Sequence, residues 1–473
     1  MHTKKGVAAN TGVSVITRTL GLVLAFFSLS LVTRGLGPDK AGEYFTILAY
    51  GGIFNVLADL GLYQTLLRDM SRPGADDADI FSKFFSLRVV SLLVILGVVA
   101  PLIALLFPYS ASVKVGIAIG SFAFVCSSLI TFFIAVFQKY LRMRVVAAGE
   151  FVSRIVQVAL TLWLLQAGYG VIGALLAMLG AGIVQLGVVA FFARRHILYR
   201  FTPDLGAWKI ILRVSYPIAL STIFSFIYFK IDSLMLSLLK PSYDVGVYGL
   251  AYKILETIVA YPPIYIGLLV PVFVRHASEN REKFFHTVHQ AFDALSFIAF
   301  PMLAGGLMLA PKIIALFGKG YDDSVRTLMI LLGATFAIFF GTLYSNMLIV
   351  IHKQKTLAYI YFWGMILNVG ANFYAIPHWS YIGAAWTTLL TEVGVTIAMI
   401  LLLKKFGWFS AALRRIPRIA LASVLMVFVL FLFSSQSILI LLLIGAVSYG
   451  AFAFLLKAVS VAEIRGLARP SLK

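Results

Sequence analysis

Charged residues and cysteines are scarce in this chain. Only 12% of its 473 residues are charged and 61% are hydrophobic, whereas a soluble globular domain carries about 25% charged residues. Cys126 is the only cysteine, which excludes a disulfide framework and a cysteine metal site. The sequence also lacks a phosphate-binding glycine loop, a nucleophile motif and a metal-ligand cluster. We therefore expect no cofactor and no ATP-driven pumping.

The sequence instead contains many long hydrophobic runs. Apolar runs of about 18 or more residues recur along the chain, and each is long enough to cross roughly 30 Å of hydrocarbon as a helix. The short alternating segments of a membrane barrel are absent. The pattern predicts an all-α integral membrane protein with fourteen transmembrane helices. The expected spans are 12–33, 42–66, 84–107, 115–137, 151–168, 171–192, 214–239, 246–274, 291–310, 324–350, 357–376, 382–403, 418–433 and 438–456.

The formal net charge of +20 follows the membrane topology. If the N-terminus is cytoplasmic, most of the 39 Lys and Arg residues fall in segments on the cytoplasmic side. The positive-inside rule then predicts that both termini are cytoplasmic. We explain the basic balance by topology and by attraction to anionic lipid headgroups, so membrane lipids are expected partners and nucleic acid is not.

The links between the spans are short, which leaves no room for a soluble catalytic domain, and we expect no enzymatic activity. The longest link, from Ala193 to Arg213, divides the first six spans from the next six. The expected organisation is an N-terminal lobe over residues 1–200, a cytoplasmic linker over 201–213, a C-terminal lobe over 214–404, and two further spans over 417–457.

Two patches of sequence recur in the two lobes. GPDKAGEYFTILAY (Gly37 to Tyr50) and KPSYDVGVYGLAY (Lys240 to Tyr252) share an acidic residue and a Gly-x-Tyr step at an offset of 204. GYGVIGALLAM (Gly168 to Met178) matches HWSYIGAAWTT (His378 to Thr388) at an offset of 210. An even number of spans per lobe gives both lobes the same orientation, so we expect parallel repeats about an axis along the membrane normal.

Four ionisable residues lie inside two neighbouring spans, Lys230 and Asp232 in one and Lys253 and Glu256 in the next. Charges at bilayer depth are costly and usually face a bundle interior or a watery cavity. Antiparallel helices would place Asp232 level with Lys253, and Lys230 level with Glu256, about 12 to 16 Å below the outer surface. These pairs could be structural clasps or contacts to a substrate.

The first lobe has a different pattern of buried charge. Arg18 and Asp59 lie at similar depth from the cytoplasmic side and could form a pair. Arg88 and Arg154 lie only a few residues inside their expected spans, so they could line a cavity or snorkel to the cytoplasmic headgroups. Glu392, near the middle of its span, could be an ion carrier or a hydrogen-bonded core residue.

Two long segments resemble a known family. They are LVTRGLGPDKAGEYFTILAYGGIFNVLADLGLYQTLLR (Leu31 to Arg68) and YPIALSTIFSFIYFKIDSLMLSLLKPSYDVGVYGLAYKILE (Tyr216 to Glu256). The chain is similar here to the polysaccharide transporter branch of the MOP superfamily, the O-antigen and exopolysaccharide repeat-unit flippases. The resemblance extends to the span count, the duplicated six-span lobes and the two additional terminal spans.

The resemblance implies a MOP/MATE-like bundle whose two lobes enclose a central cavity that opens alternately to either side. It implies a flippase of the bacterial inner membrane that moves undecaprenyl-diphosphate-linked oligosaccharides from the cytoplasmic to the periplasmic leaflet for cell-surface polysaccharide biosynthesis. Cavity cations would contact the diphosphate. By position, Arg18 fits such a contact best, with Lys230 and Lys253 as partners from the second lobe.

The resemblance also suggests which partners and residues to expect. A polysaccharide polymerase is a possible partner, and buried carboxylates could couple a returning H+ or Na+. The candidate substrate-binding residues are Arg18, Asp59, Arg88, Arg154, Lys230, Asp232, Lys253 and Glu256, and the candidate ion-coupling residue is Glu392.

Two other functions remain open at this point. A multidrug or cation antiporter of the MATE type would require net acidic cavity residues, whereas the buried charges here lean towards basic. A membrane-embedded polysaccharide polymerase or ligase would be expected to present a sizeable extracytoplasmic loop with catalytic Arg or His. The loops on that side are too short.

Overall fold

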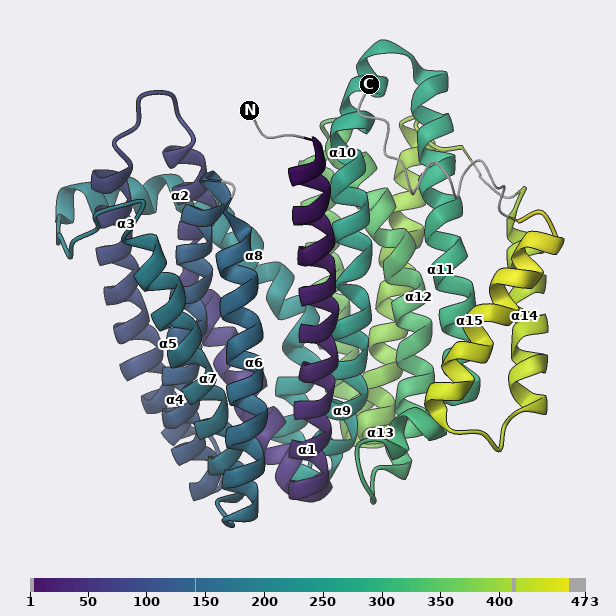
Figure 1. Ribbon diagram of the computed structural model, residues 1–473, viewed down its shortest axis with the longest axis horizontal. Coiled ribbons are helices and arrows are strands. Elements are labelled where there is room, and N and C mark those ends of the chain that lie inside the picture. Colours follow the sequence, from purple (N-terminus) through teal and green to yellow (C-terminus); the bar gives the residue numbers. More distant parts are fainter. Residues whose placement is uncertain (1–3, 141, 411–413, 459–473) are drawn as a thin grey trace. The chain divides into compact units, whose positions relative to one another are not determined.

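The computed structural model describes residues 4–140, 142–410 and 414–458, and within them the side chains from Gly21 onward except those of Leu22 and Ser221. Every regular element in this part of the chain is a helix (Figure 1). The helices are α1 (Lys4–Asp59), α2 (Leu62–Met70), α3 (Asp77–Leu92), a π-helical turn η1 (Leu93–Val99), α4 (Ala100–Leu106), α5 (Ala111–Lys139), α6 (Met143–Gln166), α7 (Gly170–Ala193), α8 (Leu205–Leu239), α9 (Ser242–Val259), α10 (Tyr261–Glu279), α11 (Arg281–Ala315), α12 (Asp322–Val350), α13 (Gln354–Lys405), α14 (Ile416–Leu432) and α15 (Ile438–Leu455).

The prediction of an all-α membrane fold is confirmed. Eleven helical segments among the described residues are long and apolar enough to cross a membrane. In hydrocarbon a helix satisfies its own backbone hydrogen bonds, which is why such runs fold this way. The figure of fourteen spans stays a prediction, because α1 and α13, with 56 and 52 residues, each exceed the length of one crossing.

Both of these long helices contain a break. In α1 the break is at Gly37, with φ 70° and ψ 172°, and Pro38 follows it. In α13 it is at Ser380, with φ 49° and ψ −132°. Three residues later, a Cβ atom on Gly383 would lie 2.3 Å from the Ala375 carbonyl oxygen, so only glycine permits the two legs of α13 to approach this closely.

The chain forms two compact units. Unit 1 comprises Met1–Gly246 with Phe317–Gly320, and unit 2 comprises Val247–Leu316 with Tyr321–Lys473. The helix α8 belongs to unit 1, whereas the repeat pattern assigns it to the second lobe. The division into lobes at 201–213 stays a prediction.

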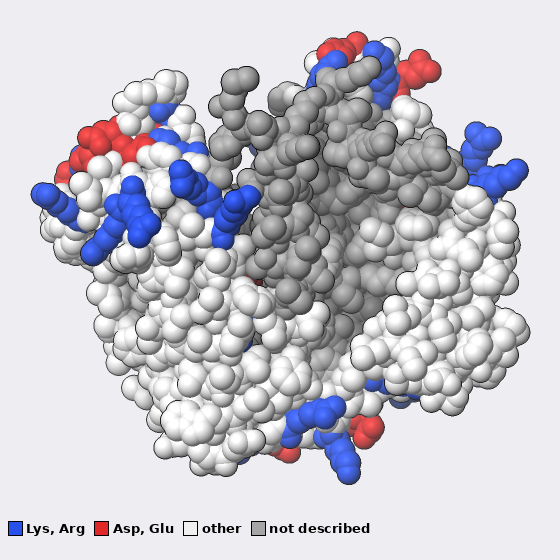
Figure 2. Space-filling view, in the orientation of Figure 1, with Lys and Arg blue, Asp and Glu red and all other residues white. Residues whose placement is uncertain are grey.

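In unit 1, α1 packs against α5, α6 and α8, and α7 packs against α5 and α6. One end of this bundle is filled by a cluster of rings from α3, α5 and the segment after α7, which includes Phe81, Phe85, Phe133 and Tyr199. On the face that Figure 2 shows, Lys and Arg side chains gather at the ends of the helices and the flanks between are largely uncharged. This distribution suits helices that lie in hydrocarbon.

In unit 2, α12 packs against α11 and α13, and α11 also packs against α10 and α14. The last two helices, α14 and α15, pair with each other and enclose a small core with α11 (Figure 1). The Tyr449 hydroxyl of α15 donates a hydrogen bond to the Phe297 carbonyl of α11 at 2.8 Å. This bond fixes the terminal helix pair to the rest of the unit.

The first repeated patch brings its two copies together within unit 1. A Cβ atom on Gly42 would lie 1.7 Å from the Ser242 carbonyl oxygen, and one on Gly246 would lie 2.0 Å from the Pro38 carbonyl oxygen. The backbones of α1 and α9 therefore meet at two glycines that are equivalent in the repeat.

Candidate functional site

The clearest charged constellation in unit 1 lies where α1 ends. Asp59 is the last residue of α1, and the next two, Leu60 and Gly61, have φ angles of 51° and 71° before α2 begins at Leu62. A Cβ atom on Gly61 would lie 2.7 Å from the Ser215 carbonyl oxygen of α8. The sequence ADLG thus ends the helix. The Ala58 carbonyl and the Asp59 carboxylate lie side by side there.

Arg88 of α3 binds this helix end. Its side chain is only 3% exposed, and its Nη1 atom lies 2.8 Å from Asp59 Oδ1 and donates to the Ala58 carbonyl at 3.0 Å. Its Nη2 atom donates to the Ser128 hydroxyl of α5 at 2.5 Å, and the Ser91 hydroxyl also donates to the Ala58 carbonyl at 3.0 Å. One guanidinium therefore joins α1, α3 and α5. The Asp59 side chain keeps 22% of its surface exposed.

The interpretation that Arg88 snorkels to headgroups is wrong, because the residue is buried and paired. The error came from the expected span, which began at 84, whereas α3 begins at Asp77 and carries Arg88 deeper. The described partner of Asp59 is Arg88. The side chain of Arg18, the predicted partner, lies outside the described residues.

Arg154 lies near the middle of α6, because this helix begins at Met143 rather than at 151. Its side chain is 35% exposed, with Nη1 3.0 Å from Gln157 Oε1 and Nη2 3.9 Å from Glu150 Oε1. Both contacts are on its own helix. Whether Arg154 touches a substrate stays a prediction.

An open hollow of about 520 Å³, lined by both polar and apolar side chains, lies between α2 and α8, beside the break at Gly61. It is lined by Gln64, Pro217, Ile218, Thr222 and Ser225. The sequence analysis named none of these residues as candidates. Gln64 could have been identified from its position about one turn after the sequence ADLG, on the helix α2, which packs against α8.

Two charged candidates lie farther along α8, in unit 1. Asp232 is 1% exposed and Lys230 is half-buried, and both are engaged in interactions within the protein. The predicted pairs of Lys230 with Glu256 and of Asp232 with Lys253 join residues of different units and stay predictions.

In unit 2, Lys253 and Glu256 form an ion pair on α9, with Nζ 3.0 Å from Oε2. Their side chains are 46% and 26% exposed, although both residues lie inside the candidate membrane span Ser242–Glu279. An exposed charge at bilayer depth requires contact with water. We therefore expect this surface of α9 to face water.

Glu392 of α13 is 7% exposed and interacts with other residues of the protein. It lies within electrostatic range of Tyr361, a residue of the other leg of the same helix. Among the described residues no group of three or more His, Cys, Asp and Glu side chains could hold a metal ion.

Comparisons with known proteins fit this architecture. The family model described as "Polysaccharide biosynthesis protein" matches residues 5–277, and a second model, MatE, matches residues 217–374. No curated protein sequence matches the chain.

Several solved structures share the fold. The lipid II flippase MurJ in an inward closed conformation has a TM-score of 0.75 and 18% identity, over 97% of this chain and 100% of that chain. An inward-facing multidrug resistance MATE transporter has a TM-score of 0.62 and 17% identity, over 84% of this chain and 100% of that one. A MOP superfamily transporter from Pyrococcus furiosus, with a binding pocket described as having reverse polarity, has a TM-score of 0.54 and 18% identity, over 83% and 92%.

Proposed function

The chain belongs to the polysaccharide biosynthesis protein family, and we propose that it is a flippase for lipid-linked oligosaccharides. Its substrate is an undecaprenyl-diphosphate-linked repeat unit, which it moves from the cytoplasmic to the periplasmic leaflet by alternating access. In this proposal the protein resides in the bacterial inner membrane with both termini cytoplasmic, acts as a transporter rather than an enzyme, and supplies a polysaccharide polymerase.

The observation that carries the proposal is the exposed Lys253–Glu256 pair inside a membrane span. Moving a diphosphate and many hydroxyls into hydrocarbon without replacement hydrogen bonds is prohibitive. A water-accessible surface with fixed cations supplies those contacts while the polyprenyl tail remains in lipid. The side-chain amide of Gln64, in the hollow between α2 and α8, offers a further hydrogen-bonding group for sugar hydroxyls.

The residues divide into three roles in this proposal. Arg18, Lys230 and Lys253 contact the diphosphate, and Arg154 adds positive potential. Arg88 holds Asp59 and the end of α1 in place. Asp232, Glu256 and Glu392 are the carboxylates that would carry a returning H+ or Na+.

The membrane potential would assist this movement. With the cell interior negative, the outward passage of an anion is favoured by about 2.3 kcal/mol per charge per 100 mV. A rocking motion of one lobe against the other would expose the site first to one side and then to the other.

The proposal is tested by reconstituting the protein in vesicles that contain a polyprenyl-diphosphate oligosaccharide and measuring how fast the sugar reaches the outer leaflet, with a lectin. We expect Arg18→Gln and Lys253→Gln to slow this transfer at least tenfold. The control Lys283→Gln, an exposed lysine of α11, leaves it unchanged. Equal rates for all variants, or no transfer by the unaltered protein, would contradict the proposal.

A second candidate is a MATE-type cation antiporter, because the MatE model matches residues 217–374. The same vesicles distinguish it. An antiporter would accumulate an organic cation such as ethidium against an H+ or Na+ gradient, and its transport would depend on the carboxylates Asp232 and Glu392. The flippase proposal expects no such accumulation.

A further inference from the structure

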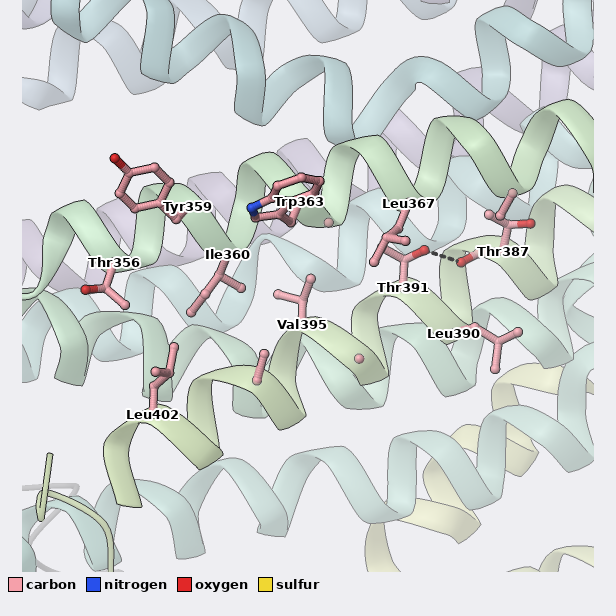
Figure 3. Close-up of a pocket in the computed structure, with 14 residues that line it drawn as sticks. Thr356, Tyr359, Ile360, Trp363, Leu367, Thr387, Leu390, Thr391, Val395 and Leu402 are labelled. Carbon is pink, nitrogen blue, oxygen red and sulfur yellow. Dashed lines mark hydrogen bonds between the residues drawn. The ribbon is translucent and has the colours of Figure 1, made fainter. Parts of the chain in front are cut away.

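A long groove runs along the surface of unit 2 between the two legs of α13. Its volume is about 550 Å³, within the range of ~300–1,000 Å³ usual for ligand sites. Figure 3 shows Thr356 and Leu402 at one end of it and Thr387 and Leu390 at the other. Small residues such as Gly394 and Ala398 form part of its lining and leave the space open.

The walls of the groove are apolar and exposed. Tyr359, Trp363, Leu367 and Leu390 are 60% to 67% exposed, although they belong to a helix long and apolar enough to cross the membrane. Such a surface has hydrocarbon as its natural neighbour.

Two threonine hydroxyls along the groove are already satisfied. The Thr391 hydroxyl donates to the Thr387 carbonyl at 2.7 Å (Figure 3), and the Thr387 hydroxyl donates to the Gly383 carbonyl at 2.9 Å. Neither hydroxyl is left to donate to a ligand. The middle of the groove therefore suits a hydrocarbon chain and not a sugar or a peptide.

Four lysines lie at the Thr356 end of the groove, at the start and the end of α13. Lys353 immediately precedes α13, three residues before the lining residue Thr356, and Lys405 ends α13, three residues after the lining residue Leu402, so both lie close to this end of the groove. Lys353 Nζ lies 4.7 Å from the centre of the Phe406 ring, which brings the start and the end of α13 together. Lys355 and Lys404 are exposed beside them.

We propose that this groove binds one anionic phospholipid of the bilayer, with an acyl chain between the legs of α13 and the phosphate at Lys353 and Lys405. The lysines at one end of the groove set the orientation of the bound lipid. The Thr387 and Thr391 hydroxyls are bonded to carbonyls of their own helix, so the middle of the groove favours an apolar chain. None of the charged residues assigned to transport lines the groove, although Glu392 directly follows the lining residue Thr391, and the bound lipid stabilises unit 2.

Trp363 provides a direct readout, because it lines the groove and is 60% exposed. The full chain, with Trp363 retained and the other tryptophans changed to Phe, is reconstituted in phosphatidylcholine. Brominated phosphatidylglycerol or brominated phosphatidylcholine is then added, and quenching of Trp363 is measured. The anionic lipid should quench at a lower mole fraction, by a factor on the order of five per lysine.

Two sets of variants test the phosphate contact and the acyl-chain contact separately. Lys353→Gln with Lys405→Gln should remove the preference for the anionic lipid, whereas the control Lys283→Gln should keep it. Gly394→Leu should fill the groove and reduce quenching by both lipids, because a Cβ atom there meets nothing within 4 Å and the chain can still fold. Gly370→Leu, also free of contacts but outside the groove, should not.

Equal quenching by both lipids, or a preference that survives the lysine changes, would overturn the proposal. It would also be overturned if unlabelled undecaprenyl phosphate displaced the brominated lipid where unlabelled phosphatidylglycerol did not, since the occupant would then be a substrate tail. None of these readouts requires transport, so their failure leaves the flippase proposal untouched.

Discussion

Gly42 and Gly246 contact each other in a reciprocal way. A Cβ atom on Gly42 would meet the Ser242 carbonyl oxygen and lie 3.0 Å from Gly246 N, while a Cβ atom on Gly246 would meet the Pro38 carbonyl oxygen and lie 3.2 Å from Gly42 N. Pro38 and Ser242 are separated by the same 204 residues as the two glycines. The repeat in the sequence is thus also a symmetry of the contact.

The first prediction concerns this contact. Gly42→Ala and Gly246→Ala should each destabilise the protein by about 1 to 3 kcal/mol or more, because the added methyl group meets rigid backbone rather than a side chain. The control Gly187→Ala, in α7, meets nothing within 4 Å and should change little. Unfolding can be followed with a thiol-reactive dye, since Cys126 is the only cysteine and is buried. Equal melting curves for Gly42→Ala and Gly187→Ala would contradict the close crossing.

The second prediction concerns the ion pair at the end of α1. Arg88→Gln should destabilise the protein by about 3 to 5 kcal/mol, because it leaves the partly buried Asp59 carboxylate without its described ion-pair partner and removes one of the two side-chain donors to the Ala58 carbonyl. Lys83→Gln, on the same helix, removes an exposed pair with Asp79 and should cost less than about 1 kcal/mol.

A double-mutant cycle separates the pair from the rest of the network. If Arg88 and Asp59 interact as described, the effects of Arg88→Gln and Asp59→Asn on the melting temperature are strongly non-additive. Simple additivity would mean that the two groups do not share an interaction in the membrane.

The third prediction concerns the break in α13. Ser380, with φ 49°, occupies a conformation that favours glycine, and its repeat equivalent at an offset of 210 is Gly170, with φ 53°. Ser380→Gly should therefore leave the melting temperature unchanged or raise it. Gly170→Ser should lower the melting temperature, because it reduces the free energy of unfolding by about 1 kcal/mol. The reverse order of the two effects would show that the break is not where the structure places it.

The fourth prediction concerns pH and lies outside the membrane spans. The Tyr140 hydroxyl donates to Asp77 Oδ2 at 2.8 Å, and burial together with this bond raises the pKa of Tyr140 to about 12. The bond therefore stabilises the fold fully below the ordinary pKa of 10.0 and is lost as the pH rises through about 12.

Tyr140→Phe should accordingly lower stability by about 1 kcal/mol, by the same amount at every pH from about 6 to 9. The difference from the unaltered protein should shrink above pH 10. Tyr169→Phe, at an exposed tyrosine, serves as the control. A difference that changes between pH 6 and 9 would contradict this account of the Tyr140 hydrogen bond.

Much of the fold could be predicted from the sequence because bilayer thickness and backbone hydrogen bonding leave few choices to a long apolar run. The family and the MOP-like membrane fold are confirmed. The repeat was also readable, since Gly42 and Gly246 stand in the same Gly-x-Tyr step that brings them together in space. Helix starts were read less well, because polar residues such as Asp77 extend a membrane helix beyond its apolar run.

The site was harder to predict for the same reason. Depth was judged from apolar boundaries, so Arg88 appeared shallow although its helix begins a full two turns earlier than expected. Partners across helices depend on rotation about each helix axis, which the sequence does not reveal. The sequence thus predicted a pair of Asp59 with Arg18, which stays a prediction, and missed Arg88, which lies 2.8 Å from Asp59.

The central claim of the proposal, that a water-accessible surface exists at bilayer depth and that the proposed cations give it a positive potential, can be measured with one cysteine. In a Cys126→Ala background, Thr257→Cys places a thiol one turn from Lys253 on the exposed side of α9. The account predicts that a negatively charged methanethiosulfonate reagent modifies this thiol, and does so faster than a positively charged one. A thiol at Leu268, 75% exposed and apolar, should resist both reagents. Failure of Thr257→Cys to react, or faster reaction with the cation, would contradict the account.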